Sequence, residues 1–591
     1  MSEGGWGAGF CWMEGEGCGK MGGAMMEDRA MTLRETLEKS VQKHGDKTLM
    51  LFKRDKKWQR WSFREFEAKV RNVAEVLVRM CHVHPGDRVA LMAGNSPEWC
   101  AVHYGITGIG ATAVPVDVKL QEKEVCHVLG DSGAKALFTD GHGMDLLGAM
   151  ERHCPALRFV VAMDGPVEEG ETERIKTYDF DKVMAETAKA SMGKGSAYSR
   201  LKPKPEDLAS LIYTSGTTGR QKGAMLTHGN FTGNFESLDA AIEILPDDNF
   251  FLLLPLHHAF AFTTCLVTPI AAGVQISFAE GLRTISENIR ETKPTVVLGV
   301  PLLLEKMYAK MRSGLKANKG ASLLWKLGVR GPVRKGLLDK LGGRLRLMVS
   351  GGAPIDAELI RGMEELGLHP REGYGLTECS PVLALTPYEG PVVEGSCGRV
   401  LPGVEMKVFD ANSEGVGELA ARGANVMKGY FNNPGATEDV FRDGWFLTGD
   451  LGFIDERNFV HITGRKKALI VNREGKNIYP EEVELQINAS PLIRECVVLG
   501  YRESGEAVGE HVGVIVVPDD DGIRALEEKE HRKLSEQDIL ALMKSEVKNQ
   551  VSHLADYKHP RRLQLRWEEF NKTSTGKIKR YLYAMATDTA G

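Results

Sequence analysis

Short apolar segments alternate with longer amphipathic segments over the first 350 residues of the chain. The segments "TLRETLEKSVQKHG" and "SFREFEAKVRNVAEVLVRM" have the apolar spacing of helices, and Ser62 followed by Glu65 is typical of a helix N-terminal cap. "KALFTD", "RFVVAMD" and "PTVVLGVP" are short apolar runs that end in loops. Because strands that alternate with helices usually pair in parallel, this order predicts an α/β fold with mostly parallel sheets covered by helices.

The pattern changes after about residue 399. "GVEMKVFD", "VGELAARG" and "GFIDERNFVHITG" are short and bounded by turns, so we expect a small antiparallel, β-barrel-like part. After Arg465 a compact mixture of strands and helices follows. The sequence therefore predicts a large N-terminal domain over residues 31–464 and a smaller α+β domain over residues 465–591.

Composition and the first residues argue against several classes of protein. The formal net charge of −5 disfavours a general nucleic-acid binder. The ten cysteines include no CxxC pair, which disfavours a zinc ribbon or a disulfide scaffold and suits the cytoplasm. Residues 1–30 are rich in Gly and Met, without a basic start or an apolar centre, and predict a disordered leader rather than a signal peptide.

Residues 249–279 contain no charged side chain and are long enough to span a bilayer. However, Pro255, Pro269 and the pair His257–His258 interrupt this stretch, and no basic cluster flanks it to set an orientation. We therefore expect a buried strand–helix–strand passage here.

A loop rich in glycine and hydroxyl groups follows the apolar run "LASLIY". Backbone N–H groups, hydroxyls and a lysine in such a loop are suited to phosphate binding. The loop is not a Walker A motif, because its lysine is followed by glycine rather than by Ser or Thr. The candidate phosphate-binding residues are Thr214, Ser215, Gly216, Thr217, Thr218, Gly219 and Lys222.

Three later runs carry further candidates. In "EGYGLTE", Tyr374 beside Gly375 can approach a flat base, Thr377 offers a hydroxyl to phosphate, and Glu378 offers a hard oxygen ligand to Mg²⁺. In "GWFLTGD", Asp450 can accept both hydroxyls of a ribose, and Arg465, 15 residues later in "GRKKALIV", can brace the same sugar or a phosphate. "NKTSTGKIKR" places Lys577 in a turn near the C-terminus, and Cys379 is interpreted as a packing residue rather than a nucleophile.

With these four runs in this order, residues 32–585 resemble the adenylate-forming synthetases, which include acyl-CoA synthetases, luciferases and free-standing adenylation domains. The resemblance implies that a carboxylate attacks the α-phosphate of Mg·ATP, and that a thiol then displaces AMP after a mobile C-terminal domain rotates. It also implies that Gly352, Ala353 and Tyr374 border adenine, and that Lys577 stabilises charge in the first step only. By the same resemblance, Lys467 lies at the hinge and His258 lies near the acyl pocket.

Within that family, "RLRLMVSGGAPI" and "GYGLTECSPVLA" look most like long-chain fatty acyl-CoA synthetases, with coenzyme A as acceptor. Three alternatives stay open: a medium-chain or aryl acid–CoA ligase, an acyl-AMP or acyl–carrier-protein ligase, and a catalytically silent nucleotide- or lipid-binding homologue. A homodimer is compatible with the sequence.

Residues 310–346 form a basic insert with eleven Lys and Arg residues against one acid, Asp339. Trp325 and several leucines are interleaved with them. Two interpretations stay open, a solvated helical face and a surface that attaches peripherally to the anionic inner face of a membrane.

Overall fold

The computed structural model describes residues 30–165, 170–193, 195–214, 221–281, 283–390, 392–474, 476–503, 509–572 and 578–585. The predicted leader before residue 30, the loop residues Ser215, Gly216, Thr217, Thr218 and Gly219, and Lys577 lie outside these ranges.

The first of two large sheets has eight strands in the order β10-β9-β4-β3-β5-β6-β8-β7. All neighbouring pairs are parallel except β9 with β10 and β7 with β8, at the two edges. The strands are β3 (Arg88–Met92), β4 (Thr112–Pro115), β5 (Ala136–Thr139), β6 (Phe159–Ala162), β7 (Gly170–Glu171), β8 (Lys176–Asp179), β9 (Leu208–Thr214) and β10 (Lys222–Thr227).

The second large sheet has nine strands in the order β17-β16-β15-β14-β13-β11-β12-β1-β2. Its central pairings, from β15 to β1, are parallel, and its edge pairings are antiparallel. The strands are β1 (Thr48–Arg54), β2 (Lys57–Ser62), β11 (Asn249–Leu252), β12 (Gln275–Phe278), β13 (Val296–Gly299), β14 (Leu347–Gly351), β15 (Pro370–Gly375), β16 (Val382–Leu385) and β17 (Arg399–Val400).

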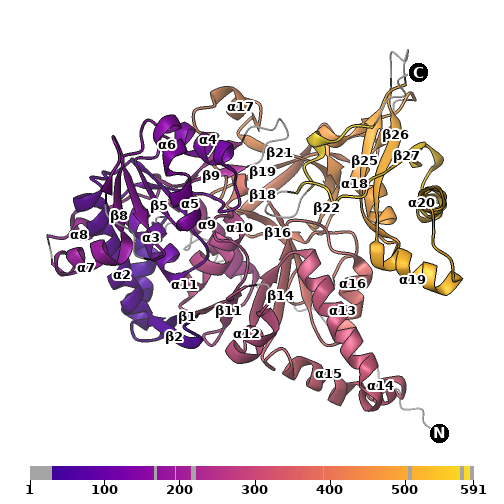
Figure 1. The fold of residues 1–591 in the computed structure, drawn as a ribbon, viewed down its shortest axis with the longest axis horizontal. Helices are drawn as coiled ribbons and strands as arrows, with labels where there is room; N and C mark the ends of the chain where they lie inside the picture. The colour runs from indigo at the N-terminus through magenta and orange to yellow at the C-terminus, as the bar shows by residue number, and fades with distance from the viewer. Residues whose placement is uncertain are drawn as a thin grey trace, which may run out of the picture.

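Helices cover both faces of each large sheet, which confirms the predicted α/β fold (Figure 1). The main core lies between the sheets: Val89 and Leu91 point into it, whereas Ala90 and Met92 pack into a second core on the outer face. The inner helices are α1 (Leu33–His44), α2 (Phe63–Glu75), α3 (Pro97–Gly108), α7 (Phe180–Ser191), α9 (His228–Ala241) and α11 (Thr268–Ala272). The outer helices are α4 (Glu122–Ser132), α6 (Leu147–His153), α12 (Ile285–Thr292), α13 (Pro301–Ala317), α15 (Arg330–Asp339) and α16 (Ala357–Glu365).

Two local predictions are confirmed in this part of the chain. Ser62 and Glu65 form the expected capping box at the start of α2. Residues 249–279 fold as β11, α10 (Ala259–Phe262), a π-helical turn, α11 and β12, and most of their side chains are buried. Among the described residues, no helix combines the length and the apolar character that crossing a bilayer requires.

The later part of the chain forms smaller units. The predicted antiparallel part is a five-stranded sheet, with β18 (Val404–Phe409), β19 (Gly417–Gly423), β20 (Phe441–Arg442), β21 (Trp445–Ile454) and β22 (Val460–Arg465). After it, an α+β unit has its own apolar core, as expected for the C-terminal residues. Its main elements are α18 (Pro480–Ile487), β25 (Ile493–Tyr501), β26 (His511–Pro518), α19 (Asp520–Glu530), α20 (Glu536–Gln550) and β27 (Arg562–Leu565).

A buried polar cluster aligns three parallel strands of the nine-stranded sheet. Asp248, Thr295 and Arg346 each directly precede a strand, namely β11, β13 and β14. Thr295 Oγ1 and Arg346 Nε donate to the same Asp248 oxygen at 2.7 and 2.9 Å. Burial raises the pKa of Asp248, but the hydrogen bonds from Arg346 and Thr295 outweigh it and leave the pKa below its usual value. The cluster fixes where these strands start, and so where their carboxyl ends lie.

We expect Arg346→Met to lower the free energy of unfolding by about 3 kcal/mol, because it leaves the buried Asp248 carboxylate without its cationic partner. Urea denaturation followed by circular dichroism measures the change. Arg344→Met is the matched control, because Arg344 is exposed and donates to one backbone carbonyl. Equal stabilities of the two variants would contradict the role given to this cluster.

Candidate active site

A large cleft opens at the carboxyl ends of the parallel strands of both sheets. Residues that follow β4, β9, β11, β13 and β14 line it, together with residues of β21, β22 and the C-terminal unit. Ligands bind to α/β sheets at these strand ends. The cavity volume is about 3120 Å³, several times that of a pocket for one small molecule, so the cleft can hold more than one substrate.

Tyr374, Asp450 and Arg465 meet on one wall of this cleft. The Tyr374 hydroxyl donates to Asp450 Oδ2 at 2.7 Å, and Arg465 Nε lies 2.7 Å from Asp450 Oδ1. Asp450 and Arg465 are register partners across β21 and β22, whereas Tyr374 comes from β15, 76 residues earlier than Asp450. The structure therefore brings together three candidates from two separate sequence runs.

Glu378 and Lys222 both contact Tyr430, a residue that the sequence analysis missed. The Tyr430 hydroxyl donates to Glu378 Oε1 at 2.8 Å, and Lys222 Nζ lies 5.0 Å from the centre of the Tyr430 ring. Lys222 pairs with Thr214 at the loop end of the β9–β10 hairpin, so both flank the phosphate-loop candidate. The only local signal for Tyr430 is its place in the turn-rich run "KGYFNNPG".

Two glycines of the cleft have steric reasons to be glycine. Gly352, directly after β14, has a φ of +89°, which side chains rarely adopt. A Cβ on Gly375 would lie 1.9 Å from the carbonyl oxygen of Pro381. Gly352, Ala353, Tyr374, Gly375 and Thr377 all line the cleft. A Cβ on Gly352 would meet nothing within 4 Å, so the backbone there is open to a ligand in the same cleft as Tyr374.

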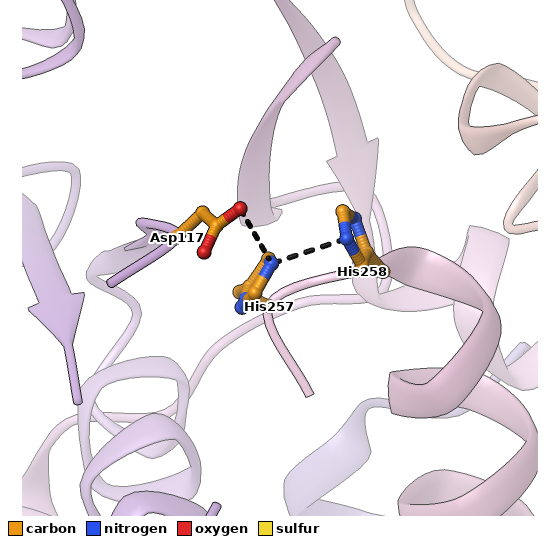
Figure 2. A group of neighbouring side chains, drawn as sticks. All are labelled: Asp117, His257 and His258. Atoms are coloured by element: carbon orange, nitrogen blue, oxygen red, sulfur yellow. Dashed lines mark hydrogen bonds and ion pairs between the residues drawn. The ribbon is translucent and has the colours of Figure 1, made fainter. Parts of the chain in front are cut away.

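His258 also faces the cleft, at the N-terminal end of α10 (Figure 2). Its Nε2 lies 3.1 Å from His257 Nε2. Burial and the neighbouring His257 lower the pKa of His258 to about 3, so its imidazole is neutral at physiological pH. Glu372, another cleft residue that the sequence analysis did not assign, has its pKa raised by burial to about 8.

Residues of the C-terminal unit also line the cleft. Lys467 follows β22 in a short 3₁₀ turn, and its neighbour Lys466 pairs with the buried Glu418 carboxylate at 2.6 Å. Lys579 Nζ lies 3.7 Å from Glu124 Oε1 on α4, so the chain near the C-terminus contacts the N-terminal unit across the cleft. Cys379 is fully buried, which raises the pKa of its thiol and fits the predicted packing role.

Known proteins share this architecture. The model of the family "AMP-binding enzyme" matches residues 37–431. The long-chain-fatty-acid–CoA ligase FadD15 of Mycobacterium bovis is 33% identical over 449 residues, which cover 71% of this chain and 72% of that protein. A feruloyl-CoA synthase of Amycolatopsis sp is 30% identical over 527 residues, which cover 88% of this chain and 92% of that protein. The crystal structure of ATP-bound MatB from Rhodopseudomonas palustris superposes with a TM-score of 0.72 at 26% identity, and covers 93% of this chain and 98% of its own.

Proposed function

Because this chain belongs to the AMP-binding enzyme family, we propose that it activates a long-chain fatty acid and transfers the acyl group to coenzyme A. In the first step a carboxylate oxygen of the acid bonds to the α-phosphorus of ATP, and pyrophosphate leaves. In the second step the sulfur of coenzyme A bonds to the acyl carbonyl carbon, its proton goes to solvent, and AMP leaves. The observation that carries the proposal is the meeting of Tyr374, Asp450 and Arg465 in one cleft with Lys222 and Glu378.

We assign the nucleotide to the wall formed by Tyr374 and Asp450. The aromatic ring and the open backbone at Gly352 and Ala353 would border adenine, and Asp450 with Arg465 would hold the ribose. Thr214, Lys222 and the loop between them would hold the β- and γ-phosphates, and Thr377 would contact phosphate.

Glu378 suits a magnesium ion that accompanies ATP. The Tyr430 hydroxyl donates a hydrogen bond to one of the Glu378 carboxylate oxygens, and a carboxylate can ligate a hard cation through its other oxygen. A bound Mg²⁺ would neutralise phosphate charge during the first step. The fatty acid is already ionised, so the first step needs no general base.

The main catalytic requirement is to bring two anions together. Fixed cations and N–H donors directed at the developing charge lower the barrier, provided that carboxylate and phosphorus are held in line. Lys222 of β10 and Arg465 at the end of β22 would supply such charges, and Lys577 would supply one from the C-terminal unit. Closure of that unit about a hinge at Lys467 would also keep water from the acyl-adenylate.

The far part of the cleft suits an alkyl chain. Apolar side chains of β13, β14, α13 and α16 line it, namely Leu298, Leu303, Met307, Val349 and Ile360. His258 would lie where this apolar part meets the nucleotide wall, near the carboxylate of the substrate. An aryl acid is the second candidate substrate, because a feruloyl-CoA synthase covers most of this chain at 30% identity.

The proposal is tested by incubating the protein with ATP, Mg²⁺, coenzyme A and a panel of acids, and by measuring AMP release. We expect release to be fastest with palmitate and oleate, and at least about tenfold slower with hexanoate, benzoate and ferulate, because short or rigid acids leave apolar surface of the cleft unfilled. A maximum at ferulate or hexanoate would overturn the long-chain assignment. No AMP with any acid would favour a silent homologue, and transfer to a carrier protein but not to coenzyme A would favour the carrier-protein alternative.

We expect Lys577→Ala to slow acid-dependent exchange of pyrophosphate into ATP about 100-fold or more, because it removes a cation directed at the reacting phosphate. The same variant should form thioester from supplied acyl-adenylate at close to the normal rate. Lys548→Ala on α20, an exposed lysine of the same unit, is the control. Equal losses in both half-reactions would contradict a role confined to the first step.

We also propose that the helical tip, defined as residues 316–330, attaches the enzyme to anionic membranes. The tip includes α14 (Lys319–Lys326), which extends from the body of the molecule in Figure 1 and has no buried side chain. Leu323 and Leu327 are 59% and 68% exposed, beside the exposed basic residues Lys319, Lys326 and Arg330. Other basic residues of the insert serve the fold instead: Arg346 pairs with Asp248, and Arg334 donates to the Glu365 carbonyl.

We expect the triple variant Lys319→Gln, Lys326→Gln, Arg330→Gln to weaken binding to phosphatidylglycerol vesicles about 100-fold at low salt, at about 1 kcal/mol per basic residue. Leu323→Ser with Leu327→Ser should weaken it further, whereas Lys544→Gln with Lys548→Gln on α20 should have little effect. Vesicle sedimentation measures the binding. Unchanged binding of the triple variant would rule out docking through the tip. A loss of dimers in the leucine variant would instead identify the tip as a contact between two copies.

A further inference from the structure

Asp117, His257 and His258 converge on one another in the wall of the cleft (Figure 2). Asp117 follows the carboxyl end of β4, a strand of the eight-stranded sheet. The two histidines lie in the segment that connects β11, a strand of the nine-stranded sheet, to α10. Within the part of the chain that the structure describes, this is the only group of three His, Cys, Asp or Glu residues close enough to share an ion. The cluster therefore exists only because the two sheets meet at this point.

Each residue directs one ligand atom at the same small volume. His257 Nε2 lies 3.1 Å from His258 Nε2 and 3.6 Å from Asp117 Oδ2, and all three ligand atoms lie within 4.8 Å of one another. The second Asp117 oxygen, Oδ1, accepts a hydrogen bond from the backbone N–H of Lys119 at 2.9 Å, which fixes the orientation of the carboxylate. The Asp117 and His257 side chains are 9% and 8% exposed, so the ligand atoms are held in packed surroundings.

A proton relay does not fit this arrangement. In a relay, a histidine binds one partner through Nδ1 and the other through Nε2, so that a proton enters at one nitrogen and leaves from the other. Here the same atom, His257 Nε2, faces both Asp117 and His258. Convergence on one nitrogen is the geometry of ligands around a common centre rather than of a chain.

We propose that Asp117, His257 and His258 bind a divalent transition-metal ion, with Zn²⁺ as the first candidate. Zinc takes imidazole nitrogen and carboxylate oxygen at about 2.0–2.2 Å, which places tetrahedral ligands about 3.3 Å apart. The distances of 3.1 Å from His257 Nε2 to His258 Nε2 and 3.6 Å from His257 Nε2 to Asp117 Oδ2 bracket that value. Imidazole ligands disfavour Mg²⁺, so this site is chemically distinct from Glu378. Three protein ligands leave a fourth position, which faces the cleft and would take water or an anionic group.

The test is a titration of the full chain, dialysed against EDTA and free of ATP, with ZnCl₂ by calorimetry and with CoCl₂ by visible absorption. We expect the wild-type protein to bind one equivalent of Zn²⁺ at this site. Asp117→Asn or His257→Gln should weaken the binding of that equivalent at least tenfold, about 1.4 kcal/mol. The intense visible bands of four-coordinate cobalt should disappear in both variants. His461→Gln is the matched control, because His461 Nε2 lies 3.8 Å from Asp455 Oδ2 and neither residue belongs to a three-ligand group.

Cysteine thiols also bind zinc, so only the binding that is lost in the variants counts. Circular dichroism establishes that each variant is folded, and if His257→Gln is not, the isosteric Asp117→Asn decides the result. Equal zinc affinities of the wild type and Asp117→Asn would overturn the proposal. So would the finding that the wild-type protein does not bind this equivalent of Zn²⁺. Because no substrate is present, the outcome is independent of whether the enzyme activates fatty acids.

Discussion

The hydrogen bond from the Tyr374 hydroxyl to Asp450 links the nine-stranded sheet to the five-stranded antiparallel sheet. The Asp450 side chain is 4% exposed, and a buried carboxylate is costly unless donors surround it. Its donors come from different elements: Tyr374 from the nine-stranded sheet, and Arg465 from the neighbouring strand of the antiparallel sheet. Backbone hydrogen bonds between residues 397–400 and 458–460 also join the two sheets, and the Asp450 carboxylate adds a buried side-chain link at the proposed nucleotide wall.

A second link in the cleft is built on Tyr430. Tyr430 bonds to Glu378, 52 residues earlier, and bridges the backbone of Ala224 in β10. The Glu378 carbonyl also accepts the backbone N–H of Met427 at 2.8 Å. Tyr430 thus positions both Glu378, the candidate Mg²⁺ ligand, and β10, the strand that follows the phosphate-loop candidate. The Asp248 cluster instead aligns β11, β13 and β14. Each link joins segments that lie far apart in the chain, so the cleft depends on tertiary rather than local structure.

This dependence explains what could be predicted from the sequence. The cap formed by Ser62 and Glu65, the alternating strands and helices, and the passage through residues 249–279 are encoded locally and were predicted correctly. The order of the strands, and the partnership of Tyr430 with Glu378, arise from packing between distant segments, for which periodicity carries no signal. The run of charges over residues 310–346 likewise gives no sign that Arg346 belongs to the Asp248 cluster and that only part of the insert is exposed and basic.

The distribution of charge along the cleft favours one orientation of a bound amphipathic substrate. Lys222 and Arg465 carry fixed positive charge on the proposed nucleotide wall. Elsewhere in the cleft, burial keeps His258 neutral by lowering its pKa to about 3, and keeps Glu372 largely protonated by raising its pKa to about 8. Neutral groups there neither repel a carboxylate nor hold it away from the phosphates. An acid with a long apolar chain would therefore gain most when its head faces the cations and its chain lies along the leucine- and valine-lined wall, which is the orientation that attack on the α-phosphorus requires.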